Sequence, residues 1–213
     1  STTIAAIQDP TAINAIRLAP GEKRLRVSLH NVVVTTPLLS SPIMGNHFFV
    51  QEAFPPADIA YSGIQIYAGY AEPEIQPGDV INLTGLYMEY YGLSEIQYGF
   101  HEQVAAGNPI SALNLGTPDL ATEDAREGYE GALIRLSNVR VNAVGLPSRG
   151  GSTPEEKDFS IVEASASGSL NPLLVSTEFY NPVVAVDDVF STFSGVLTYA
   201  WSEYRLIPRG ESD

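Results

Sequence analysis

An internal repeat constrains this chain more than any other feature of its sequence. The block Leu29-x-Asn31-Val32-x-Val34 returns as Leu136-x-Asn138-Val139-x-Val141 in the second half. Two further blocks recur in the same order: Phe48-x-Val50-x-Glu52 with Phe159-x-Ile161-x-Glu163, and Asp79-Val80 then Gly85-Leu86 with Asp188-Val189 then Gly195-Val196. Their offset drifts from about 107 to about 110 positions, as loop insertions between fixed strands would produce. We therefore predict two similar domains.

The composition fits two compact domains held together by packing. The 213 residues are 44% hydrophobic, enough for two cores of about 100 residues each. The chain has no cysteine, which excludes disulfides and thiolate metal sites. Its net charge of -14 predicts a surface that repels phosphate backbones and attracts cations. No apolar run approaches the roughly 20 residues that a membrane-spanning helix needs.

Each half contains five runs typical of β-strands, separated by Gly and Pro. They are 24–36, 47–52, 63–67, 80–88 and 95–98 in the first half, and 132–144, 158–163, 173–177, 189–198 and 204–208 in the second. This pattern favours a small barrel or sandwich in each half. We predict a leader over 1–20, a first domain over 21–106, a linker over 107–131 and a second domain over 132–213.

Several of these runs resemble a known family. The segments that carry the resemblance are Thr3–Gln8, Val32–Thr35, Phe48–Glu52, Gly63–Tyr67, Gly78–Gly85, Glu89–Ile96, Tyr129–Leu136, Phe193–Tyr199 and Tyr204–Arg209. In this order they are similar to the OB-fold-like region that precedes the nuclease domain in secreted bacterial endonuclease/exonuclease/phosphatase-family proteins. The resemblance implies an all-β fold of two tandem OB-like five-stranded β-barrels with short helical turns. The family's catalytic residues have no counterpart positions here.

The motifs of catalysis are missing from the sequence. There is no Gly-x-Ser-x-Gly elbow and no phosphate-binding glycine loop, and the three histidines have no ligand-like spacing. One arrangement leaves the enzyme hypothesis open, namely the carboxylate pair Glu89 and Glu95. For glycoside hydrolysis the two carboxylates would have to face a cleft. Because both flank a tight turn, surface acids are the ordinary explanation. We predict that the chain is not an enzyme.

Clustered acids offer a candidate cation site. Calcium takes several oxygen ligands at once. The candidate ligands are Glu123, Asp124, Glu127, Asp187 and Asp188. None of them forms the Asp-x-Asp-x-Asp-Gly pattern of a dedicated calcium loop, so a solvated acidic face is the competing interpretation.

Tyrosines offer a candidate ligand face, because OB barrels bind strands or sugars on aromatic surfaces. The candidates are Tyr67, Tyr87, Tyr91 and Tyr98. Single-strand binders also need a cationic groove, and Lys23, Arg24 and Arg26 form the only tight basic group. We therefore expect nucleic acid to be an unlikely partner.

The leader suggests self-association. Its apolar residues Ile4, Ile7, Ile13 and Ile16 could add to the sheet edge of a neighbouring copy and so build a homo-oligomer or filament. Packing of the leader on its own domain is the alternative. The start at Ser1, the low lysine content and the lack of cysteine favour a processed protein outside the cell or on its surface. We predict an extracellular structural module that self-associates. A secreted binding module for carbohydrate, protein or nucleic acid is the alternative.

Overall fold

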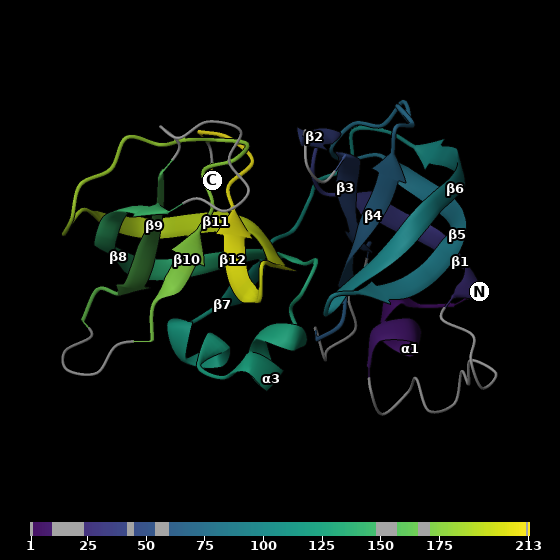
Figure 1. Ribbon diagram of the computed structural model, residues 1–213. Coiled ribbons are helices and arrows are strands. Elements are labelled where there is room, and N and C mark those ends of the chain that lie inside the picture. Colours follow the sequence, from purple (N-terminus) through teal and green to yellow (C-terminus); the bar gives the residue numbers. More distant parts are fainter. Residues whose placement is uncertain are drawn as a thin grey trace. The chain divides into compact units, whose positions relative to one another are not determined.

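The computed structural model describes residues 2–9, 24–41, 45–53, 60–147, 157–165, 171–211 and 213, and in it each half of the chain builds one closed five-stranded β-barrel (Figure 1). The first barrel contains β1 (Leu25–Val34), β3 (Gly45–Glu52), β4 (Gly63–Gly69), β5 (Val80–Tyr90) and β6 (Leu93–Ala105). The second contains β8 (Leu133–Pro147), β9 (Lys157–Glu163), β10 (Leu173–Val175), β11 (Val189–Ala200) and β12 (Glu203–Ile207). The prediction of an all-β fold with two OB-like barrels is confirmed.

Both barrels have the same strand order. In the first, the order is β1-β5-β6-β4-β3, and pairing of β1 with β3 closes the barrel. In the second it is β8-β11-β12-β10-β9, closed by β8 with β9. All neighbours are antiparallel except β4 with β6 and β10 with β12, which are parallel. This is the five-stranded Greek-key order of an OB barrel, produced twice by the sequence repeat.

Short elements complete the two units. They are α1 (Ile4–Gln8), β2 (Leu39–Ser41), β7 (Leu113–Leu115), the 3-10 helix η1 (Thr117–Leu120) and α3 (Glu123–Glu127). One compact unit comprises 1–111 together with 128–132, and the other comprises 112–127 together with 133–213. The stretch 107–131, expected to be a linker, is thus divided between the two units.

The repeated residues mark places where the backbone is unusual. Asn31 and Asn138 both adopt a positive φ, 55° and 52°, which asparagine tolerates better than most residues. In the first barrel this coincides with a shift in the register between β1 and β5. The Asp79 carboxylate accepts the Gln76 N–H at 2.8 Å, and the Asp188 carboxylate accepts the Ala185 N–H at 2.7 Å. The repeat therefore encodes an asparagine of positive φ and the same turn in both barrels.

The leader helix belongs to the core of the first barrel. Ile4 and Ile7 are fully buried in one apolar cluster with residues of β1, β3, β4, β5 and β6. Thr3 caps α1 by accepting the Ala6 N–H, and the Ile4 N–H donates to a Glu52 carboxylate oxygen at 2.8 Å. The alternative in which the leader packs on its own domain is the one observed for these residues. Ile13 and Ile16 lie outside the described residues.

A glycine contact tests how closely the first unit is packed. A Cβ atom added at Gly131, whose φ is +76°, would lie 2.6 Å from the Ile64 Cα atom. We expect Gly131→Ala to lower the free energy of unfolding by about 2–3 kcal/mol, because the backbone cannot separate without disturbing β4. Urea unfolding followed by circular dichroism measures this. Gly210→Ala is the matched control, since nothing lies within 4 Å of its added Cβ. Equal midpoints for the two variants would contradict the prediction.

Candidate nucleic-acid interface

The outer face of strands β3, β4 and β6 is buried in the first barrel. OB barrels commonly bind ligands on the face of their second and third strands, which correspond here to β3 and β4. Gln65 lies between the core residues Ile64 and Ile66 and so points outward, yet it is only 5% exposed. Phe49, on the same side of β3, is fully buried. This face is therefore not available to a ligand.

Two segments of the same unit pack on this face. The Gln51 amide donates to the Ser111 carbonyl at 3.2 Å. The segment Gly128–Ala132 approaches β4 so closely that a Cβ added at Gly63 would overlap the Ala132 backbone nitrogen. The surface of the barrel on which other OB folds bind a ligand is therefore covered here by segments of the same chain.

Carboxylates are buried at the edge of the same face. Glu95 on β6 is 4% exposed and accepts a hydrogen bond from the Gln65 amide at 3.3 Å. Burial, and the nearby charge of Glu89, raise the pKa of Glu95 to about 7. Glu130, also buried, accepts the Ser94 N–H at 2.8 Å. The Glu89 carboxylate is also held in place, because one of its oxygens accepts hydrogen bonds from the Ser94 and Tyr87 hydroxyls. Glu95 therefore does not face an open cleft with Glu89.

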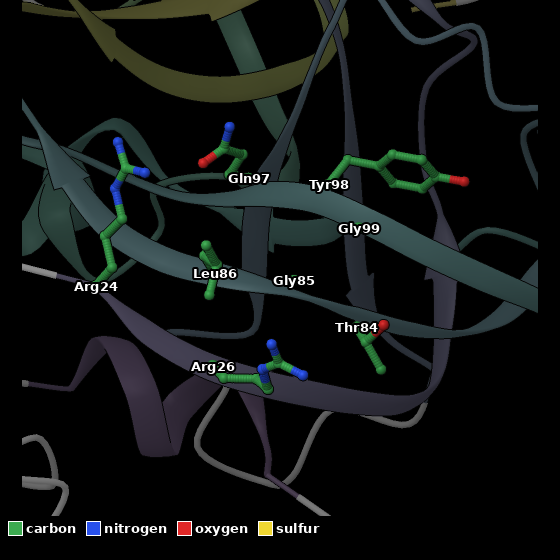
Figure 2. A pocket seen from close by; sticks show the side chains of 8 residues that line it. All are labelled: Arg24, Arg26, Thr84, Gly85, Leu86, Gln97, Tyr98 and Gly99. Atoms are coloured by element: carbon green, nitrogen blue, oxygen red, sulfur yellow. The ribbon is translucent and has the colours of Figure 1, made fainter.

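A groove of about 510 Å³ lies on the other side of the first barrel, over β1, β5 and β6 (Figure 2). Its lining contains two cations, two polar side chains, one apolar side chain, one ring and two glycines: Arg24, Arg26, Thr84, Gln97, Leu86, Tyr98, Gly85 and Gly99. Figure 2 shows the arginines at the β1 side and Gln97 and Tyr98 on β6. Here the first barrel offers an open surface.

Strand alternation explains why these side chains gather. Val27 and Leu29 point into the core, so Arg26 points outward. Arg26 pairs with Leu86 on β5, and Leu86 pairs in turn with Gln97 on β6. One outward row of side chains therefore crosses three strands. Further along the same strands, the register between β5 and β6 shifts between Thr84 and Gly85. Gly99 lies at this bulge in β6 and has no side chain to fill the groove.

The charge of the groove is positive although the whole chain is acidic. Arg24 and Arg26 are exposed, and neither forms an ion pair with another residue that the structure describes. Among the described residues, no acidic side chain lines the groove. Lys23, the third member of the basic group, lies outside the described residues. Two free guanidinium groups above a neutral floor make a site for an anion with planar, bidentate oxygens.

Tyr98 lines the groove, and a second ring, Phe100, follows Gly99 of the lining. Tyr98 is fixed, because its ring meets Phe48 of the core edge-on at 6.4 Å and its hydroxyl hydrogen-bonds the His101 Nδ1 atom at 2.9 Å. Phe100 is 65% exposed, pairs with Thr84 across the strands and stacks against the His101 ring at 6.4 Å. Sequence analysis missed Phe100, because it ended the fifth strand at Tyr98, whereas β6 continues to Ala105 with a bulge at Gly99 that turns Phe100 outward.

The four tyrosines predicted to form one ligand face are not equivalent. Tyr87 is 2% exposed inside the core, and burial raises its pKa. Tyr67 is half-buried on β4. Tyr91 is 87% exposed at the turn between β5 and β6, where it meets Tyr90 edge-on. Of the four, Tyr98 lines the groove.

The candidate calcium ligands have structural contacts in the second unit. Glu127 accepts the Tyr204 hydroxyl, and Asp187 forms an ion pair with Arg140 at 2.7 Å. Asp188 holds the turn described above, and Glu123 and Asp124 lie in the first turn of α3. Among the described residues, no group of three or more His, Asp or Glu side chains is arranged to hold a metal ion. Calcium binding stays a prediction.

Comparison with known proteins gives distant structural neighbours. No protein-family model and no curated protein matches the chain, so sequence comparison does not support the endonuclease link. A solved structure described as the Ifi202 HINa domain in complex with 20bp dsDNA has a TM-score of 0.38 at 15% identity, covering 86% of this chain and 91% of its own. The tetrameric p202 HIN2 structure has a TM-score of 0.38 at 17% identity, covering 88% and 89%. A third, described as the molecular basis for abrogation of activation of pro-inflammatory cytokines, has a TM-score of 0.40 at 15% identity, covering 90% and 94%.

Two predictions are corrected at this point. The predicted self-associating extracellular structural module is contradicted by the comparison, in which two of the neighbours are described as HIN domains, one of them in complex with dsDNA. The burial of Ile4 and Ile7 in their own barrel independently removes them from an assembly surface. The expectation that nucleic acid is an unlikely partner is contradicted by the DNA-bound neighbour. That expectation rested on the net charge and on the scatter of basic residues along the sequence. Net charge does not report how the fold gathers basic residues locally.

No helix in the described part of the chain is long and apolar enough to span a membrane.

The buried carboxylate Glu95 makes the stability of the first barrel depend on pH. Its pKa is about 7 in the folded state, against the ordinary glutamate value of 4.5 that applies to the unfolded chain. The folded state therefore holds the proton more tightly, and this contribution to stability is complete below about pH 4.5 and is lost as the pH rises through 7.

We expect Glu95→Gln to keep the contact with Gln65 and to remove this pH dependence. The variant should be more stable than the wild type at pH 8 and similar to it near pH 4, as measured by thermal unfolding across that range. Glu102→Gln, an exposed carboxylate on the same strand, is the control. Parallel pH profiles for wild type and Glu95→Gln would show the prediction to be wrong.

Proposed function

We propose that the chain is a non-enzymatic nucleic-acid-binding module and that the groove over β1, β5 and β6 is its site. The observation that carries the proposal is the pair Arg24 and Arg26, exposed at the start of β1 beside a groove of about 510 Å³ whose described lining residues include no acid. Residues two apart on a strand lie about 6.7 Å from each other on the same face. Two guanidinium groups at this spacing suit successive phosphates of one backbone.

The rest of the lining suits a sugar and a base. The Thr84 hydroxyl and the Gln97 amide can donate and accept hydrogen bonds, and Leu86 between them gives an apolar floor. A lining of this kind contacts the phosphates and sugars of a nucleic acid. It has little capacity to distinguish base sequences, since base-specific readout needs more polar groups in fixed positions. We therefore propose binding that is tolerant of sequence.

The acidity of the whole chain sets the strength of the interaction. A net charge of -14 opposes a phosphate backbone everywhere except at a local positive site. We infer that contact is confined to the groove and that affinity is modest and sensitive to salt. A protein with broad cationic faces would behave differently, because it would neutralise many phosphates.

The proposal of a non-enzymatic role rests on the surroundings of the acids. Glu95 is buried, and Glu89 is held by hydrogen bonds from Tyr87 and Ser94. A glycoside hydrolase needs both carboxylates at a cleft that admits the sugar. An extracellular location remains a proposal from composition alone.

The salt dependence of binding tests the site. We expect the double variant Arg24→Gln/Arg26→Gln to weaken binding of a labelled oligonucleotide and to reduce the slope of log K against log salt. The loss in slope is about 1.4 for a single strand or about 1.8 for a duplex, if each arginine neutralises one phosphate. Fluorescence anisotropy between 20 and 200 mM salt, about a tenfold range, measures it.

Arg135→Gln is the matched control, because Arg135 is an exposed arginine on a strand of the second barrel. This variant should bind as the wild type does. Binding that is absent at low salt, or a slope that the double variant leaves unchanged, would refute the proposed function.

A further inference from the structure

We propose that the groove selects single-stranded over double-stranded nucleic acid and that Phe100 is the platform on which an unpaired base stacks. This inference rests on the proposed function, because it assigns the kind of nucleic acid to the same groove. Its observation is separate from the two arginines: a large ring on β6, 65% exposed, that follows the lining residue Gly99 and is paired with the lining residue Thr84.

Phe100 is held in a fixed position although its face is open. Its backbone is paired with Thr84 of β5, and its ring stacks on His101 with an interplanar angle of 28°. His101 is fixed in turn by its hydrogen bond with Tyr98, whose ring packs on Phe48 of the core. A ring supported in this way loses little conformational freedom when a base stacks on it, which favours binding.

The position of Phe100 completes a path across the barrel. Arg24 and Arg26 belong to the β1 side, Thr84 and Leu86 to β5, and Phe100 to β6. Two strand spacings separate β1 from β6, about 10 Å. A nucleotide whose phosphate contacts the arginines can extend its sugar over Leu86 and place its base toward Phe100. The gap that Gly99 leaves in the lining keeps this path open.

The chemistry of the path excludes a duplex. In a double helix each base has its two faces covered by neighbouring bases, so no face is free for a side chain without unstacking. In a single strand every base has an accessible face, and stacking on an aromatic side chain is independent of sequence. Two cations and one open ring therefore match a single strand, whereas two cations alone would match either form.

The test compares one labelled 12-nucleotide strand of mixed sequence with its own duplex, using the full chain at low salt. We expect the single strand to bind at least tenfold more tightly than the duplex. We expect Phe100→Leu, which keeps apolar bulk and removes the ring, to weaken single-strand binding about tenfold. Tyr70→Leu is the matched control, because Tyr70 is a fully exposed ring of the same unit that is neither next to a lining residue of the groove nor paired with one.

The outcomes separate this inference from the proposed function. If Phe100→Leu binds the single strand as the wild type does while Arg24→Gln/Arg26→Gln weakens it, the groove is a phosphate site and the stacking inference is overturned. Equal affinity for duplex and single strand overturns it as well. If neither form binds to the wild type, both proposals fail. Circular dichroism of each variant confirms that loss of binding is not loss of folding.

Discussion

The close contact between Gly128–Ala132 and β4 decides which surface of the first barrel is left for function. At Gly63 and Gly131 two backbones meet with no room for a Cβ atom on either side. Side chains of the β3, β4 and β6 face are buried, including the charged Glu95. The surface left open lies over β1, β5 and the adjoining part of β6, and there the outward residues include two arginines that no described acid neutralises.

The two barrels share a backbone design and differ in what they bury. On the outer side of β6 and β4, the first barrel buries Glu95 with Gln65. On the paired strands of the second, Arg205 lies beside Leu174 and forms a buried contact with the Asp158 carboxylate at 3.7 Å. In a buried ion pair each charge is compensated by its partner. A buried acid without a cationic partner is instead stabilised in its neutral form, by keeping its proton. The two barrels thus share their strand order and differ in the polar pairs that they bury on these strands.

The repeat could be found from sequence because it lies at positions where the backbone itself is constrained. Asn31 and Asn138 occupy a conformation that few side chains tolerate, and Asp79 and Asp188 hold the same turn. Such positions accept few residue types, so they remain visible in a single chain. Core strands accept many apolar residues and showed the repeat through their alternation alone. The surface residues carried no repeat signal.

The sequence by itself determined the number of barrels, their five strands each and the lack of cysteine chemistry, because alternation and turn residues act over a few positions along the chain. It also identified Arg24 and Arg26 as the tight basic group. Only the tertiary structure decided that Ile4 and Ile7 are core residues, that Tyr87 is buried while Tyr98 lines a groove, and that Phe100 is exposed beside it. These outcomes depend on which strands pair and where the register shifts at Gly99, which brings together residues some 60 to 75 positions apart. No local pattern carries that information.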